Sequence, residues 1–229
     1  MKDYIYERIY DIVKQYFVVT CREKANDVTN EIIKSYNSEY RKYHNLNHIT
    51  KCLDMVNTIY TLDAVQVNNI SMAIIYHDIV YNPFSTDKRN EKNSVLRLMN
   101  DIPNILASDS GRIIQYMILA TTHDPKDMIY PTDIAVKMNI QPYQKYICDI
   151  DLHQLGCGLN EFLYTESLIR EEYKIVPDEV FYPARSKILQ SFLDRSNIYY
   201  SRLFQDRFES NARRNIKYVL DRQDIFTSE

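Results

Sequence analysis

Two of the five histidines in this 229-residue chain lie four positions apart, in the segment RKYHNLNHI at residues 41–49. If the segment is helical, four residues advance the chain by about 400°, so His44 and His48 point to nearly the same side. Two imidazole rings would then face one cleft. Imidazole nitrogens bind metal ions and exchange protons near neutral pH, which makes both residues candidates for a chemical site.

Further side chains of the metal-binding type follow along the chain. His77 and Asp78 are adjacent, and Asp149 and Asp151 lie in the segment CDIDLHQLG. Histidine nitrogens and carboxylate oxygens suit zinc, iron, manganese or magnesium-type ions, and a catalytic site keeps water positions open. One histidine from a first helix, the His-Asp pair from a second and an aspartate from a third could close around a single ion.

The composition indicates that helices position these side chains. The chain has only three glycines, far below the usual frequency of roughly 7%, and a strand-rich protein needs glycine in its turns. No internal repeat, low-complexity stretch or flexible linker interrupts it. We therefore expect an all-α protein with a single domain.

The hydrophobic pattern predicts where these helices lie. Asn45 and Asp63 are expected to begin helices as N-caps, and the second helix carries His77 and Asp78 in its last turn. Asn90 is expected to cap another. The predicted helices cover residues 4–17, 27–40, 46–60, 64–80, 91–99, 111–123 and 141–156, the last with Pro142 in its first turn, and two or three more lie between 160 and 222. Residues 124–140 show no clear pattern.

Bulk charge and hydropathy exclude several classes of partner. The net charge of −3 and the pI near 6.0 do not indicate the positively charged surface that binds duplex nucleic acid. No run reaches the roughly 18 apolar residues of a membrane span, and the start lacks the apolar core of a signal peptide. We expect a cytoplasmic protein without a membrane partner.

The motifs in this order resemble the HD superfamily of metal-dependent phosphohydrolases, which is named for its His-Asp pair. The chain looks most like a family of small HD phosphohydrolases, and the likeness covers residues 40–216. Its YHNxxH segment is also similar to the cyclic-nucleotide phosphodiesterases. The segments that support the resemblance are YHNLNHI, YHDIVY, NEKNS, ATTHD, DIDLHQLG, IREEY and ARRNI. The resemblance implies an HD-type helical bundle that forms one domain over residues 1–229.

The resemblance also implies a set of metal ligands. One divalent ion, which could be Mn, Mg, Zn or Fe, would be held by His48, His77, Asp78 and Asp151. Asp149 is the alternative to Asp151, but the aspartate of the superfamily usually lies directly before a leucine, as Asp151 does. A second ion bridged by Asp78 is a further expectation.

Catalytic and substrate contacts follow from the same resemblance. His44 would act as the general acid that protonates the leaving oxygen, while Glu91 and His123 would contribute to a second metal site or orient the attacking water. Asn45 and His123 are expected to contact the substrate.

Three arginines in family-like segments are candidates for holding phosphate. Arg170, Arg185 and Arg195 could each bind it in a bidentate manner, and surface salt bridges are the alternative for each of them. The family commonly has glycine before the second of these arginines, whereas this chain has Ala184. Arg170 and Arg185 would make the substrate pocket locally basic.

The expected activity is hydrolysis of a phosphoester by a metal-activated water, with a small phosphorylated substrate that we expect to be a nucleotide. The alternative is a helical protein that binds or senses a nucleotide with little or no catalysis. Loss of ligands would favour that alternative, and the chain retains all of them. The sequence leaves monoester and diester substrates open.

Overall fold

The computed structural model describes residues 2–18, 21–83, 90–123 and 134–226. Within these ranges every regular element is a helix and no strand occurs, which confirms the all-α prediction. The chain divides into two compact units, residues 1–150 and 151–229. The single HD-type domain stays a prediction. No helix in the described ranges is both long and apolar enough to cross a membrane.

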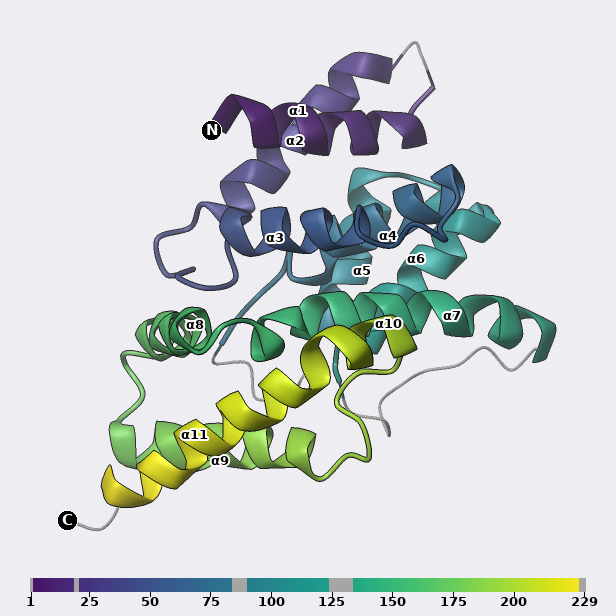
Figure 1. The fold of residues 1–229 in the computed structure, drawn as a ribbon. Coiled ribbons are helices and arrows are strands. Elements are labelled where there is room, and N and C mark those ends of the chain that lie inside the picture. The colour runs from purple at the N-terminus through teal and green to yellow at the C-terminus, as the bar shows by residue number, and fades with distance from the viewer. Residues whose placement is uncertain (1, 19–20, 84–89, 124–133, 227–229) are drawn as a thin grey trace. The chain divides into compact units, whose positions relative to one another are not determined.

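Most of the first unit consists of helices that the sequence predicted (Figure 1). Asn45 and Asp63 are N-caps as expected, and Asp63 forms a capping box with Gln66. The elements are α1 (Lys2–Val13), the 3₁₀ turn η1 (Lys14–Tyr16), α2 (Arg22–Tyr36), α3 (Leu46–Val56), α4 (Ala64–His77), α5 (Asn90–Asp101), the 3₁₀ turn η3 (Ile105–Ala107), α6 (Asp109–Ala120) and α7 (Ile134–Asp151).

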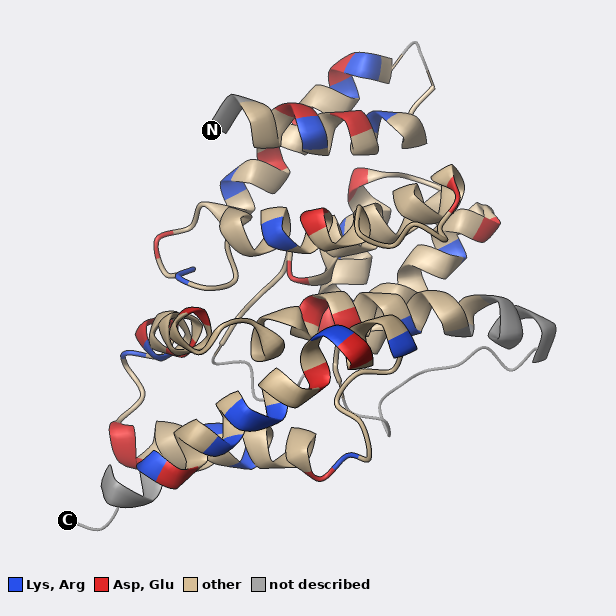
Figure 2. Cartoon of the chain, in the orientation of Figure 1, with Lys and Arg blue, Asp and Glu red and all other residues tan. Residues whose placement is uncertain are grey.

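Helix α4 is the centre of this unit. All its residues from Asn69 to His77 are buried, and it packs against α1, α3, α5 and α6. Figure 2 shows no charged residue on it, as expected for a helix whose residues are all buried from Asn69 onward. His77 therefore ends a helix that its neighbours hold firmly in place.

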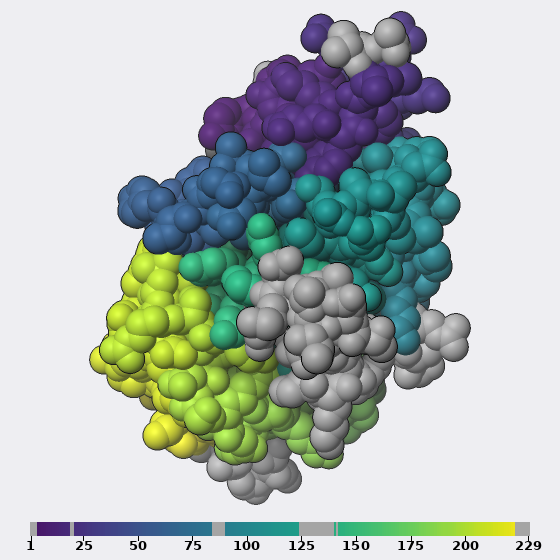
Figure 3. Space-filling model, turned by 90° about the vertical axis from the view of Figure 1, so that its right-hand side faces the viewer, coloured from purple at the N-terminus to yellow at the C-terminus, as the bar shows by residue number. Residues whose placement is uncertain are grey.

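The N-terminal helices cover one side of this centre. Figure 3 shows the purple N-terminal residues beside the blue and teal residues of the same unit, and α1 packs against α4. The hydroxyl of the buried Tyr36, at the end of α2, donates a hydrogen bond of 2.8 Å to the carbonyl of Ile75 in α4. This bond connects the segment before α3 to the last turn of the central helix.

The end of α7 is fixed by neighbouring helices of the first unit. The Gln144 amide and the Cys148 thiol donate to carbonyls of α6, at 3.2 and 3.3 Å. The thiol of Cys52 in α3 lies 3.9 Å from the carbonyl of Ile150. Asp151 is the last residue of α7 and follows this anchored turn, at the boundary of the two units.

Several details of the predicted helices differ from the structure. Helix α2 covers Arg22–Tyr36 rather than residues 27–40, and α3 ends at Val56 rather than at residue 60. Pro142 lies inside α7 rather than in its first turn, because the helix already begins at Ile134. Asn90 is the first residue of α5, and its side chain bonds both the N–H and the carbonyl of Asn82, at 3.1 and 3.2 Å. Its amide thus closes a loop, a contact that local sequence does not reveal. The unassigned residues 124–133 lie outside the described ranges.

The second unit is built around its last helix. Helix α11 (Ser210–Phe226) packs against α8 (Leu159–Glu172), α9 (Asp178–Leu193), the turn η4 (Leu152–Gly156) and a π-helical turn, η5 (Gln205–Glu209). In the ARRNI segment, Arg213 bonds three backbone carbonyls near the end of α9, and Asn215 donates to the carbonyls of Leu155 and Cys157. Both side chains thus hold this unit together. The short helix α10 (Arg202–Phe204) directly precedes η5.

We expect Gly111→Ala to destabilise the first unit strongly. A Cβ atom there would lie 1.9 Å from the carbonyl oxygen of Ile105, so the first turn of α6 must move away from η3. Overpacking against backbone should cost about 3 kcal/mol or more in the free energy of unfolding. Urea denaturation measures this cost.

Gly158→Ala is the matched control, because a Cβ at Gly158 meets no atom within 4 Å. Gly158 is the N-cap of α8, a position that favours glycine over alanine, so its loss should be about 1 kcal/mol or less. Equal stability of Gly111→Ala and the unmodified protein would contradict the packing of α6 on η3.

Candidate metal centre

Four side chains from α3, the end of α4 and the end of α7 form a group that could hold a metal ion. They are His48, His77, Asp78 and Asp151, and one donor atom from each lies within 4.8 Å of all the others. The two histidines are buried and the two aspartates are half-buried. Asp149, the alternative from the sequence, is fully buried and is not in this group. The structure thus brings together the four side chains that the HD resemblance implied.

The distances in the group suit a shared ion. His77 Nε2 lies 2.9 Å from the nearer carboxylate oxygen of Asp78 and 3.4 Å from His48 Nε2, and the distance from His48 Nε2 to Asp78 is 3.9 Å. Ligands bound at roughly 2.1 Å to one ion lie about 3–4 Å from one another. Two nitrogens and two carboxylates in this arrangement fit a first-row divalent ion with little movement.

The orientation of His77 makes it a ready ligand. Its Nδ1 lies 2.8 Å from the carbonyl of Ile74, which can only accept, so Nδ1–H is the donor and Nε2 is the ring nitrogen directed at the group. That nitrogen faces a carboxylate oxygen of Asp78 and a ring nitrogen of His48. Ring nitrogens and carboxylate oxygens that face one another with lone pairs repel one another unless a cation lies among them. A proton or a metal ion satisfies this requirement.

His48 is held by its own helix. Its backbone N–H lies 3.4 Å from the side-chain oxygen of the N-cap Asn45, and the buried Cys52 thiol lies 3.7 and 3.8 Å from its two ring nitrogens. Cys52 was not among the residues that the sequence singled out. The signal that could have identified it is its position four residues after His48, one turn along α3.

His44 lies beside the group but outside the helix. Because Asn45 is the N-cap and has an extended backbone, α3 starts after His44, and the two histidines do not share a helical face as the spacing suggested. Their rings are nevertheless neighbours, with centroids 6.1 Å apart. His44 stacks on Tyr81 with a centroid distance of 4.0 Å, a contact that the sequence did not suggest.

The side chain of Asn45 is occupied with local structure. Its oxygen accepts from the N–H groups that begin α3, and its amide donates to the carbonyl of Lys42 at 2.6 Å. This double role explains why asparagine stands here. A substrate contact by Asn45 stays a prediction.

Glu91 and His123 lie within electrostatic reach of the group. Burial raises the pKa of Glu91, and the nearby charge of Asp78 raises it further, while His123 and His77 act in the opposite direction. His123 follows α6 and has a left-handed backbone, with φ of 55°. The catalytic role of Glu91 and the substrate contact of His123 stay predictions.

The raised pKa of Glu91 predicts a pH-dependent effect of Glu91→Gln in metal-free protein. Glu91 binds its proton more tightly in the folded protein than in the unfolded chain. Ionisation of Glu91 therefore lowers the free energy of unfolding once the pH rises above the ordinary glutamate pKa, and has no effect below that pKa. The variant should therefore have a higher Tm than the unmodified protein at about pH 7, and the same Tm at about pH 3. Thermal unfolding with a chelator present tests this.

Glu39→Gln provides the control, because the side chain of Glu39 is exposed and its replacement should change the Tm at about pH 7 less than Glu91→Gln does. A Glu91→Gln variant that is no more stable than the unmodified protein at neutral pH would refute the assigned environment of this carboxyl.

The arginines proposed to bind phosphate are paired within the second unit. Arg185 makes a bidentate contact with Glu166, at 2.9 and 2.5 Å. Arg170 bonds Asp178 and the carbonyls of Tyr173 and Val176, which closes the connection between α8 and α9. Salt bridging was the alternative that the sequence left open for both arginines, but the Arg185–Glu166 pair is largely buried rather than on the surface. Substrate contacts by Arg170 and Arg185 stay predictions.

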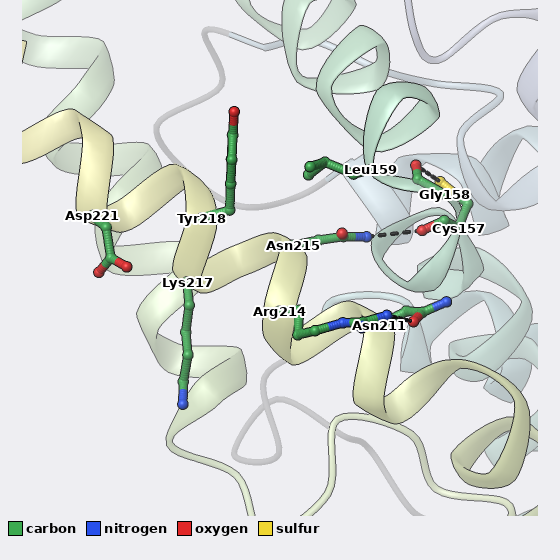
Figure 4. A pocket seen from close by; sticks show the side chains of 9 residues that line it. All are labelled: Cys157, Gly158, Leu159, Asn211, Arg214, Asn215, Lys217, Tyr218 and Asp221. Atoms are coloured by element: carbon green, nitrogen blue, oxygen red, sulfur yellow. Dashed lines mark hydrogen bonds between the residues drawn. The ribbon is translucent and has the colours of Figure 1, made fainter.

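A separate pocket of about 600 Å³ lies within the second unit (Figure 4). None of the predicted site residues lines it. Its wall includes Asn215, whose amide bonds the carbonyl of Cys157, and Arg214, which bonds the side chain of Asn211. The lining is Cys157, Gly158, Leu159, Asn211, Arg214, Asn215, Lys217, Tyr218 and Asp221.

The chain was compared with protein-family models, curated proteins and solved structures. None of them matches. The functional argument therefore rests on the buried His/Asp group of this all-α chain, which could hold a metal ion.

Proposed function

We propose that this chain is a metal-dependent phosphohydrolase of the HD type that cleaves a phosphoester of a small molecule, a nucleotide in the first instance. The observation that carries the proposal is the convergence of His48, His77, Asp78 and Asp151 within 4.8 Å of one another. The motif order along the chain supports the phosphohydrolase class, and the donor chemistry supports the metal.

The four side chains would act as ligands. A divalent ion in this group would lower the pKa of a bound water and screen the negative oxygens of the phosphoryl group. The hydrogen bond from His77 to the carbonyl of Ile74 keeps its ring in the tautomer that can bind a cation. Because His48 and His77 are buried, bulk water does not compete for their nitrogens.

His44 would supply the proton that the leaving oxygen needs. Its ring lies next to the ring of His48, and stacking on Tyr81 fixes its plane. A protonated imidazole can give its proton to a developing alkoxide. A group beside the ligands, rather than among them, is suited to this step.

Glu91 would take the proton of the attacking water or orient that water. A partly buried carboxylate beside the proposed ion is suited to accept a proton from a bound water, and Glu91 lies close enough to Asp78 for its charge to act on Glu91. His123 acts on the same carboxyl.

Turnover of a panel of phosphate compounds tests the proposal. Metal-free protein would be reconstituted with Mn, Mg, Zn or Fe and given cyclic nucleotides, linear nucleotides and simple phosphate monoesters and diesters. We expect hydrolysis of one class, dependent on one of these ions and stopped by a chelator. If protein that has bound metal hydrolyses no compound of the panel, the phosphohydrolase proposal is contradicted. Nucleotide binding measured by calorimetry would then favour a protein that senses a nucleotide.

A further inference from the structure

Arg41 is a buried cation that joins two distant segments of the first unit. Its side chain donates to the carbonyls of His44, Asp78 and Ile79, at 3.2, 2.7 and 2.9 Å. The residue is only 5% exposed. One of its partners lies in the loop before α3, and the other two lie directly after α4.

Aromatic rings surround the guanidinium. Its central carbon lies 5.0 Å from the ring centroid of Tyr36, 5.7 Å from Tyr81 and 5.9 Å from Tyr40, distances at which cation–π attraction operates. Burial, and next the charge of Asp78, raise the pKa of Tyr36 well above its usual value, so this ring stays a neutral phenol. No carboxylate forms an ion pair with Arg41 among the residues that the structure describes.

The contacts of Arg41 hold both the main chain of His44 and the ring that packs against its side chain. Arg41 bonds the main chain of His44 and lies against Tyr81, the ring on which the His44 imidazole stacks. The same guanidinium bonds the carbonyl of Asp78, whose carboxylate belongs to the His/Asp group. Since His44 precedes α3 and Asp78 follows α4, neither is held by a helical hydrogen-bond ladder alone.

We propose that Arg41 is a positioning residue that sets the place of His44 relative to Asp78. This inference rests on the proposed function, because it assigns to Arg41 the orientation of the proton donor. The planar fork of arginine can bond carbonyls on two segments at once. Lysine keeps the charge but ends in a single nitrogen, so Arg41→Lys separates the geometry from the charge.

The first test is spectroscopic and needs no activity. The ring protons of His44, stacked on Tyr81, should be shifted upfield by the ring current of the tyrosine in the metal-free protein. In Arg41→Lys we expect this shift to shrink toward the value of an unstacked histidine, with signals assigned through His44→Gln. An unchanged His44 signal in Arg41→Lys would overturn the proposal, even if the chain proves to have no phosphohydrolase activity.

Arg213→Lys is the matched control. Arg213 also bonds three backbone carbonyls, those of Leu193, Arg195 and Ser196, but it lies in α11 of the second unit. Its replacement should lower stability and leave the His44 signal in place. A His44 shift of equal size in Arg213→Lys would make the effect general and overturn the specific role of Arg41.

The second test uses the reaction. Arg41→Lys should keep its metal and lose about 10- to 100-fold in kcat on an ester with a poor leaving group, the range found for residues that orient catalytic groups. A nitrophenyl ester should be affected much less. Equal slowing of both esters would overturn the proposal. It would also be overturned if Arg41→Lys and Arg41→Gln both unfold while Arg213→Lys folds, because Arg41 would then act on stability alone.

Discussion

Asp78→Ala is expected to leave the purified protein without its metal ion and to lower kcat/KM by about 10³-fold or more. Its carboxylate lies 2.9 Å from His77 Nε2 and 3.9 Å from His48 Nε2, so it can share one ion with both histidines. Loss of the ion removes several kcal/mol of transition-state stabilisation, and each 1.4 kcal/mol is tenfold in rate. Elemental analysis and turnover of the same sample measure both effects.

The control for this substitution is Asp54→Ala. Asp54 also lies on a helix of the first unit, but it is exposed and pairs with Arg8, so its replacement should change neither metal content nor rate. Asp151→Asn should lose the metal and Asp149→Asn should keep it. Full metal content in both Asp78→Ala and His77→Ala would show that the ion is held elsewhere.

His44→Gln should separate proton donation from metal binding. If His44 protonates the leaving oxygen, the variant keeps its metal and its fold but loses about 10²- to 10⁴-fold in turnover of esters with poor leaving groups. A nitrophenyl ester hardly needs that proton and should lose far less. Steady-state rates on the two esters, with metal content and Tm measured alongside, provide the comparison.

Other roles of His44 make different forecasts. If His44 were a metal ligand, its replacement would remove metal from the protein. If His44 were only structural, its replacement would lower the Tm and slow the hydrolysis of both esters equally. Equal slowing with metal content and Tm unchanged would refute the general-acid role and leave His44 as a residue that only orients the substrate.

Much of the first unit could be predicted because its signals are local. N-caps such as Asn45 and Asp63 reveal themselves by residue type just before an apolar pattern, and both are caps in the structure. The grouping of His48, His77 and Asp78 could be expected because α3 and α4 are clear from their apolar residues. The fourth member, Asp151, required the resemblance to the HD superfamily, because spacing did not distinguish it from Asp149.

The contacts that the sequence did not reveal are those between distant segments. Arg41 reaches carbonyls 37 and 38 residues along the chain, and Tyr81 comes to lie under His44 only once α3 and α4 pack together. The start of α7 was missed for a related reason. Pro142 is typical of a first turn, yet the helix continues on its N-terminal side.

Anomalous diffraction from crystals grown with Mn²⁺ tests the central claim most directly, since it locates the ion without any assumption about the substrate. We predict a single strong peak bonded to His48 Nε2, His77 Nε2 and the carboxylates of Asp78 and Asp151, with a weaker second peak only if Asp78 bridges two ions. The Asp78→Ala protein should lack the strong peak. A manganese peak at another place, with none among these four side chains, would contradict the assignment of the metal centre.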